Sequence, residues 1–355
     1  MIPRFPDGQT LVVASAAAVL GVLGVLLSVW GNPDNSGVCV SCFLENSAGA
    51  LGLHGNPRLQ YLRPELPGFV LGAFAAAFPL GEFRARGGSA PLLRFVAGFF
   101  IIVGCAVFIG CPIKLGLRFA AGDLSALAGV AGLAAGVWVG LQSLRSGVDF
   151  GEAGRQPAVA GGPVPVIALA AAVAVFLRPS FLSFSATGSG AEHAPAAVSL
   201  AAGMCVGVLG QRSRLCITGL LRDFYLLGRR SPFLPAVAAF LAGAAVTAVA
   251  TGRFHPGMYG QPGAHTEFVW SFLAMLLVGW VSVIVGGCPF RQLIKAGEGD
   301  TDAGMTVAGM VFGAAVAQGW GIAATAAGVS PTGRTAVLVG LIFISSLTIF
   351  LRRRA

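Results

Sequence analysis

Charged residues are scarce in this sequence. Asp, Glu, Lys and Arg make up 10% of its 355 residues, while apolar residues make up 55% and the mean hydropathy is +0.81. A typical soluble domain devotes about a quarter of its residues to charge. A chain with so little charge cannot cover a water-soluble surface of this size, so the composition excludes the soluble globular class and indicates a membrane protein.

Three kinds of functional motif are also missing. The four histidines fall in expected loops without ligand spacing, so we assign no role to His54, His193, His255 or His265 and expect no metal or cofactor. No nucleotide-binding motif is present, which argues against pumping driven by this chain alone. The net charge of +9 is spread among short segments, so nucleic acid is not an expected partner.

Long apolar runs dominate what is present. They come in blocks of roughly twenty residues, about the length that a helix needs to cross the hydrocarbon core. We therefore expect an all-α polytopic protein with about ten transmembrane helices, near 10-30, 66-83, 92-109, 124-144, 163-178, 195-209, 233-250, 267-286, 303-325 and 333-351. The first run is longer than the apolar core of a signal peptide and lacks a cleavage site, so we interpret it as a retained span.

The distribution of cations predicts the orientation. With the N-terminus inside, expected cytoplasmic segments hold 16 of the 23 cations, and the three C-terminal arginines act as an anchor. The positive-inside rule then places both termini in the cytoplasm, which ten spans also require. The expected surroundings are the lipid bilayer of a bacterial inner membrane.

Two halves of the chain share one motif order. A shift of 177 residues aligns "GCPIKLGLRFAAGD", which starts at Gly110, with "GCPFRQLIKAGEGD", which starts at Gly287. The same shift aligns "CVSCFLEN" at Cys39 with "CITGLLRD" at Cys216. Two separate segments agree on one offset, so the sequence predicts an internal duplication.

The duplication predicts the domain organisation. We expect one integral membrane domain over 1-355, with repeat 1 at 10-145, a connector with one span at 146-186, repeat 2 at 187-326, and an additional span with a basic tail at 327-355. Each repeat carries four spans and the connector adds one, so corresponding spans run in opposite directions. In transporters with such inverted repeats, the sites lie near the midplane where interrupted helices meet.

Four segments are too short to cross the membrane and too apolar for ordinary loops. Because irregular backbone at membrane depth must be covered by protein or a water-filled cavity, we interpret them as re-entrant half-helices at 38-53, 111-121, 215-227 and 288-297. In each Gly-Cys-Pro, the proline suits the first helical position, which places Cys111 and Cys288 at an N-cap. Free N–H groups and the helix dipole favour an anion there. The alternative to an anion site is that Gly-Cys-Pro simply ends one helix and starts the next, with the cysteine as a small buried apolar residue.

The seven cysteines leave other interpretations open. Cys39 and Cys42 form a C-x-x-C, but the second copy keeps only its first cysteine and no histidine stands at ligand spacing, which argues against zinc. A redox pair remains an alternative. We expect Cys105 and Cys205, which lie within spans, to be packing residues.

Charged residues next to the half-helices are the remaining candidates. Lys114 and Arg291 follow their cysteines by three residues and can reach the same volume, or they can extend to the interface, as Arg118 and Lys295 can. An intramembrane charge is a functional hypothesis by default.

Three acidic positions have structural interpretations. We expect Asp123 and Asp300 to cap the helices that follow them. Arg222 and Asp223 are expected to form a structural pair rather than a proton relay, because Glu45 and Asn46 replace them in the other half.

These motifs resemble the YeeE/YedE sulfur-transport family, in "GCPIKLGLRFAAGD", "GQRSRLCITGLLRD" and "GGCPFRQLIKAGEGD". "GVCVSCFLENSAGALGLH" followed by "QYLRPE" is more narrowly similar to the YedE-type branch, to which a selenium role is attached. The resemblance implies inverted repeats whose short helices meet in a waist, where thiosulfate-uptake members pass the anion between thiols. Its cysteines correspond to Cys39, Cys111, Cys216 and Cys288. Ten spans rather than nine would depart from the thiosulfate transporter.

Residues and resemblance together predict an uptake permease for a small sulfur or selenium anion, without enzymatic activity. The expected pathway residues are Cys39, Cys111, Cys216, Cys288, Lys114, Arg291, Gly110 and Gly287, with Cys42, Arg118, Lys295 and Arg222 as secondary candidates. A cytoplasmic sulfur- or selenium-handling protein is a candidate partner. The alternatives are a membrane thiol-disulfide oxidoreductase or sulfurtransferase that uses the same cysteines, and a scaffold subunit without transport.

Overall fold

A computed structural model describes residues 7–151 and 153–352. Its first half contains the helices α1 (Asp7–Val29), α2 (Val40–Ala50), α3 (Glu65–Ala77), α4 (Pro91–Phe108), α5 (Pro112–Ala120), α6 (Ala126–Arg145) and α7 (Pro163–Leu177), with the short strands β1 (Arg86–Gly87) and β2 (Gly154–Arg155) and the 3₁₀ turn η1 (Ala158–Gly161). The second half contains α8 (Ala196–Ser213), α9 (Ile217–Leu227), the 3₁₀ turn η2 (Gly228–Arg230), α10 (Phe233–Ala250), α11 (Phe268–Ile284), α12 (Pro289–Gly297), α13 (Thr301–Gly319) and α14 (Pro331–Leu351).

A helix lies at each of the ten expected spans. Within the described residues, seven helical segments are long and apolar enough to cross a membrane: α1, α4 with α5, α6, η1 with α7, α10, α11 with α12, and α14. Two expected spans are wrong at their ends: α3 stops at Ala77 rather than at 83 and has 13 residues, and α13 stops at Gly319 rather than at 325. At 1.5 Å per residue α3 measures about 20 Å, which is less than the hydrocarbon thickness.

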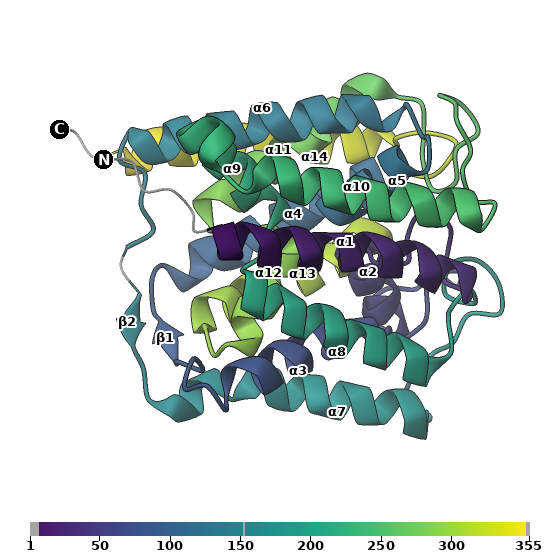
Figure 1. The fold of residues 1–355 in the computed structure, drawn as a ribbon, viewed down its shortest axis with the longest axis horizontal. Helices are drawn as coiled ribbons and strands as arrows, with labels where there is room; N and C mark the ends of the chain where they lie inside the picture. The colour runs from purple at the N-terminus through teal and green to yellow at the C-terminus, as the bar shows by residue number, and fades with distance from the viewer. Residues whose placement is uncertain (1–6, 152, 353–355) are drawn as a thin grey trace.

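The longer helices run side by side along the longest axis of the molecule (Figure 1). Four helix pairs form the packed framework: α1 with α10, α3 with α8, α4 with α13 and α6 with α11. α4 also packs against α11, which joins the two halves at the centre. α1 begins and α14 ends at the same end of the molecule, where the antiparallel pair β1 and β2 also lies.

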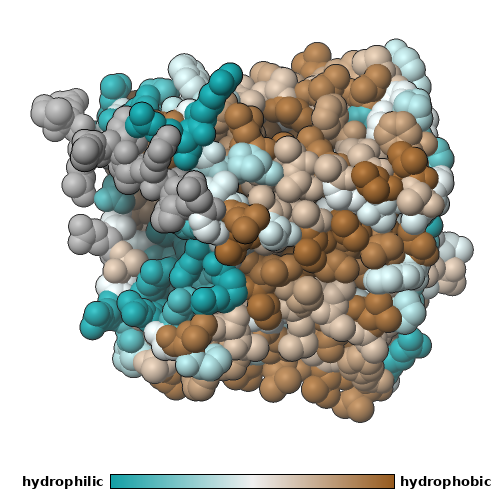
Figure 2. Space-filling view, in the orientation of Figure 1, coloured by the Kyte–Doolittle hydropathy of each residue, from teal (hydrophilic) through white to brown (hydrophobic). Residues whose placement is uncertain are grey.

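The surface agrees with insertion in a bilayer. Across the middle of the face that contains α1, α8 and α10, the surface is mostly apolar, and hydrophilic residues gather at the end near β1 (Figure 2). Large apolar side chains such as Val246, Ile342 and Phe350 are exposed. In water such a surface would be unfavourable, whereas in lipid it is not.

Small residues allow the helices to pack closely. A Cβ atom on Gly132 or Gly136 of α6 would overlap backbone atoms of α11, and a Cβ atom on Gly309 of α13 would overlap the Phe95 carbonyl of α4. Membrane helices associate largely through such close backbone contact, because lipid provides no hydrophobic force between them.

The α4–α13 contact gives a testable prediction. Gly309→Ala should lower the thermal stability of the purified protein in detergent, by about 1–3 kcal/mol, because the added methyl group forces α13 away from α4. Melting followed by size-exclusion chromatography measures the change. Gly319→Ala, at the end of the same helix, is the control, since no atom lies within 4 Å of its added Cβ. Equal melting of both variants would contradict the packing argument.

Candidate functional site

Four short helices begin at a cysteine. Cys39, Cys111, Cys216 and Cys288 are the N-caps of α2, α5, α9 and α12, and all four are buried. The expected short helices and the expected N-cap positions of Cys111 and Cys288 are confirmed. With 9 to 11 residues, these helices are too short to cross a membrane, so their first turns place free backbone N–H groups inside the protein.

Proline sets the start of two of these helices. Pro112 and Pro289 occupy the first turn of α5 and α12, directly after extended cysteines. Proline is favourable there because its fixed φ matches the helix and the missing N–H is one that has no intrahelical partner. The N-terminal turn therefore starts at a defined residue, immediately next to the thiol.

The glycine before each cysteine makes room for a cation. A Cβ atom on Gly110 would lie 2.7 Å from Cδ of Lys114, and a Cβ atom on Gly287 would lie 2.9 Å from Cγ of Arg291. Both contacts would be too close for a side chain. The absence of a side chain lets the cation's aliphatic stem fold back over the helix start.

The residue before that glycine differs between the halves. Ile109 ends α4 with φ of 63°, and Gly286 stands at the matching position with φ of 78°. The left-handed region costs about 1–2 kcal/mol for a residue with a side chain and little for glycine. Only the first joint therefore holds a strained residue.

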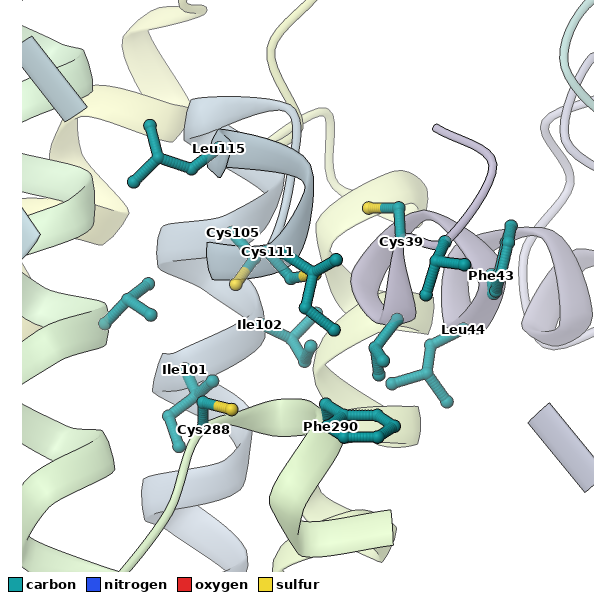
Figure 3. Packing of buried hydrophobic residues seen from close by; sticks show 14 of the residues in the cluster. Cys39, Phe43, Leu44, Ile101, Ile102, Cys105, Cys111, Leu115, Cys288 and Phe290 are labelled. Carbon is teal, nitrogen blue, oxygen red and sulfur yellow. The ribbon is translucent and has the colours of Figure 1, made fainter. Parts of the chain in front are cut away.

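The first thiol group contains Cys39, Cys42 and Cys111. The Sγ atoms of Cys39 and Cys42 lie 2.7 Å apart, and Cys111 is buried on the same side of Ile102 as Cys39 (Figure 3). Cys39 Sγ accepts the Cys42 backbone N–H at 3.4 Å and contacts Ser41 Oγ at 3.4 Å. The sulfur atom of Cys39 thus takes the place of the side-chain oxygen that usually accepts this N–H at a helix N-cap.

The second thiol group repeats this arrangement. Cys216 Sγ lies 3.7 Å from Cys288 Sγ, accepts the N–H of Gly219 at 3.3 Å, and contacts Thr218 Oγ1 at 3.4 Å. It also accepts the Cys288 N–H at 3.4 Å. The matching position for Cys42 is Gly219, so only the first group has an adjacent second thiol on the same half-helix.

A cavity of about 630 Å³ borders the first thiol group. Lys114 Nζ lies 3.9 Å from Cys42 Sγ, and within the described residues Lys114 forms no ion pair. The polar lining residues are Ser28, Asn32, Asp34, Ser36, Cys42, Glu45, Asn46, Arg63, Lys114, Ser189, Glu192, Arg253 and Gln318. Arg253 pairs with Asp34, and Gln318 bonds Glu45. A buried ammonium without a carboxylate partner is a suitable anion contact.

A smaller cavity of about 200 Å³ borders Cys216. Arg291 lines it, but its charge is compensated because Nη1 lies 3.1 Å from Oε1 of Glu298. Glu298 also pairs with Arg214 at 3.2 Å, and Arg214 pairs with Glu82 at 3.3 Å. The two candidate cations therefore differ: Lys114 is available to an anion, whereas Arg291 is held in an ion-pair network.

The two cavities lie at opposite ends of α11. Pro262 and Gly263, just before this helix, line the first cavity, while Ser282 and Val283 in its last turn line the second. Buried apolar side chains separate the thiol groups: Cys39, Cys105 and Cys111 lie on one side of Ile102, and Cys288 lies on the other side, next to Ile101 and Phe290 (Figure 3). The arrangement is a two-sided site with a closed middle.

Four charged residues singled out in the sequence have structural partners. Arg118 is 1% exposed and pairs with Asp123 at 2.7 Å, and Lys295 pairs with Asp300 at 3.4 Å. Neither cation lines either cavity. The expected cap is confirmed for Asp300, which accepts the N–H of Ala303, but it is wrong for Asp123. Ser125 is the N-cap of α6, and Asp123 is used by Arg118 and Ser125 instead.

The remaining candidates give mixed outcomes. Arg222 and Asp223 form the expected pair at 2.7 Å, and both line the second cavity. Cys105 is fully buried, as expected for a packing residue. For Cys205 this expectation is wrong, because it lies exposed on α8.

A buried arginine near the first cavity was not singled out by sequence. Arg63 donates to Asn32 Oδ1, to Asn46 Oδ1 and to the carbonyl oxygen of Ser189, and it lies over the Phe43 ring. The sequence signal for this residue is "QYLRPE", but a single arginine does not reveal that its acceptors come from the loop after α1, from α2 and from the loop before α8.

Two histidines without an assigned role also hold the site's loops. His54 Nε2 bonds the Glu45 carbonyl at 2.8 Å, and His265 Nε2 bonds the Val107 carbonyl at 2.8 Å. The Glu45 carbonyl lies in the middle of α2 and the Val107 carbonyl in the last turn of α4, so the two rings tie neighbouring loops to helices of the site.

Similarity to known proteins covers the second half of the chain. A family model described as sulphur transport matches residues 212–350, which include Cys216, Cys288 and Arg291. No curated protein matches the chain. The family match and the seven membrane-length helices together support a multi-pass membrane protein that transports a sulfur compound.

The contact between Cys39 and Cys42 is directly testable. A mild thiol oxidant such as diamide should link these two thiols within one chain, with the loss of two hydrogen atoms, because their sulfur atoms already touch. Peptide mass spectrometry after alkylation identifies the linked pair. Cys42→Ser should abolish the link, and Cys205→Ser should leave it unchanged. Preferential linking of Cys39 to any other cysteine would contradict the geometry.

Proposed function

We propose that the protein is a permease for uptake of a small sulfur- or selenium-containing anion, such as thiosulfate or a selenium analogue. The observation that carries this proposal is the pair of thiol groups at half-helix N-termini. Each group lies next to its own cavity, and the two cavities lie at opposite ends of α11. The match to a sulphur-transport model supports the substrate class.

The first cavity is the proposed entry site. It opens at the end of the molecule that the positive-inside rule assigns to the outside of a bacterial inner membrane, with both termini in the cytoplasm. The uncompensated Lys114 attracts the anion toward Cys42, and the N-termini of α2 and α5 add their dipoles.

Transfer across the middle is proposed to use thiol contacts. A thiol donates a weak hydrogen bond, and a terminal sulfur or selenium atom of the anion is a soft acceptor that suits it. Cys39 and Cys111 hold the anion on the first side, and Cys288 and Cys216 receive it on the second. Weak successive contacts favour conduction, because a strong site would retain the ion. No bond to sulfur forms or breaks in this scheme.

The second cavity is the proposed exit. There the anion meets Arg291, whose charge Glu298 already offsets. The exit therefore holds an anion less tightly than the entry, which suits release. The path between them is closed by Ile101, Ile102 and Phe290, so a conformational change must open it.

We also propose that the two halves are inverted repeats over 10-145 and 187-326. Their support is the order of packed pairs: α1 with α10 and α8 with α3, then α4 with α13 and α11 with α6. If α1 to α6 correspond to α8 to α13, the pair of α1 with α10 is equivalent to that of α8 with α3, and the pair of α4 with α13 is equivalent to that of α11 with α6. The matched cap contacts of Cys39 and Cys216 add to it.

A thiol enzyme is the second candidate function. The 2.7 Å contact between Cys39 and Cys42 favours a thiol-disulfide oxidoreductase, and a sulfurtransferase would use the same group. Both require a cysteine that cycles covalently, so mass spectrometry of the purified protein should then find a disulfide or persulfide. A protein with all thiols free that still supports uptake would exclude both. A scaffold subunit for a separate sulfur-handling protein predicts no uptake at all.

The central prediction concerns Cys111. In liposomes that contain the protein, Cys111→Ala should abolish uptake of the labelled substrate, tested with thiosulfate, selenite and sulfate, while the protein stays folded. The reason is that this buried thiol stands at the start of α5, on the same side of the closed middle as Cys39. Cys205→Ala, at an exposed position, is the matched control. Full flux through Cys111→Ala would refute the proposal.

Lys114 should control affinity more than maximal flux. Lys114→Gln removes the uncompensated charge, so the substrate concentration for half-maximal uptake should rise about tenfold or more, the cost of one hydrogen bond to a charged group. Lys114→Arg keeps the charge and should retain most of the affinity. Unchanged half-saturation in Lys114→Gln would show that the anion does not bind beside Cys42.

A further inference from the structure

An apolar groove, here called the lateral groove, lies apart from both cavities. It has a volume of about 240 Å³ and lies among α1, α5, α6, α9 and α10. Leu20, Leu115, Leu133, Leu220, Val237 and Phe240 are among its lining residues, and in the part of the chain that the structure describes no lining residue is polar. Because α1, α6 and α10 are among the membrane-length helices, the groove lies at the depth of the hydrocarbon core.

The other half of the molecule has a filled counterpart to this groove. α7 packs against α3, α8 and α12, the helices that correspond to α10, α1 and α5 in the proposed repeats. In that half, the apolar helix α7 covers the surface that α3, α8 and α12 form. In the first half, no helix of the described chain covers it, so an elongated apolar group from outside the chain would fit.

Cations stand at one end of the lateral groove. Arg229 and Arg230 form η2, and Phe233 at the start of α10 lines the groove just after them. Both arginines are exposed, and within the described residues neither forms an ion pair. By the positive-inside rule they lie at the cytoplasmic headgroup level, where basic residues between helices bind acidic lipid headgroups.

We propose that the lateral groove binds an acidic phospholipid. One acyl chain fills the groove between α9 and α10, and the phosphate meets Arg229 and Arg230. The chain then lies directly behind Leu115 of α5 and Leu220 of α9, the half-helices that begin after Cys111 and Cys216. The lipid then packs against α5 and α9 from the membrane side, as α7 packs against α12 in the other half.

The test is lipid retention by the full-length protein. Delipidated protein in detergent is mixed with dioleoylphosphatidylglycerol or dioleoylphosphatidylethanolamine, and native mass spectrometry measures the bound lipid. The wild type should retain the acidic lipid in preference to the zwitterionic one. The double variant Arg229→Gln/Arg230→Gln should lose this preference, by about fivefold for each arginine removed.

Two further variants separate charge from shape. Val237→Trp fills the groove and should reduce retention of both lipids, with Leu221→Trp as the alternative if the first variant is not monodisperse. Arg145→Gln/Arg352→Gln removes two cations beside a different cavity and should leave the preference intact. Equal retention of both lipids by the wild type, or an unchanged preference in Arg229→Gln/Arg230→Gln, would overturn the proposal. A protein dimer that blocks lipid binding at the groove would also overturn it.

Discussion

The structure depends on how backbone polar groups are satisfied at membrane depth. A helix that starts inside the hydrocarbon region leaves N–H groups that lipid cannot bond. Here sulfur accepts some of them: Cys39 accepts the Cys42 N–H, and Cys216 accepts those of Gly219 and Cys288. Because sulfur is a weak acceptor, these donors remain attractive to a stronger one, such as an anion. The same groups therefore explain both why the half-helices are stable and what they can bind.

Close packing around the half-helices keeps this arrangement in place. Glycines on α6 allow close contact with α11, and a glycine on α13 allows close contact with α4. These contacts between long helices hold the framework together around the four short helices. Buried ion pairs between Arg118 and Asp123 and between Lys295 and Asp300 fix the far ends of α5 and α12. Of the three cations that line the entry cavity, Arg253 pairs with Asp34 and Arg63 bonds neutral oxygen acceptors, whereas the ammonium of Lys114 faces the Cys42 thiol.

Much of the framework was predictable from sequence, because it follows from apolar run length and from local rules. Pro112 and Pro289 mark helix starts, and the cysteines before them are N-caps, as expected. The partners of the charged side chains were not predictable. Whether Asp123 caps a helix or pairs with Arg118 depends on the fold, and so does the ion pair of Arg291 with Glu298, seven residues away. Likewise, Arg63 finds acceptors on three separate segments that only the folded chain assembles.

Ile109 and Gly286 give the two halves different mechanical properties. Each is the joint at which a long helix passes into a half-helix that carries a thiol. A β-branched residue with positive φ has few backbone alternatives of similar energy, so the joint between α4 and α5 is stiff. Glycine has many, so the joint between α11 and α12 is compliant. The two halves share one motif but differ in the stiffness of this joint. The free energy needed to rearrange the closed middle is therefore lower at the α11–α12 joint, on the side of the second cavity.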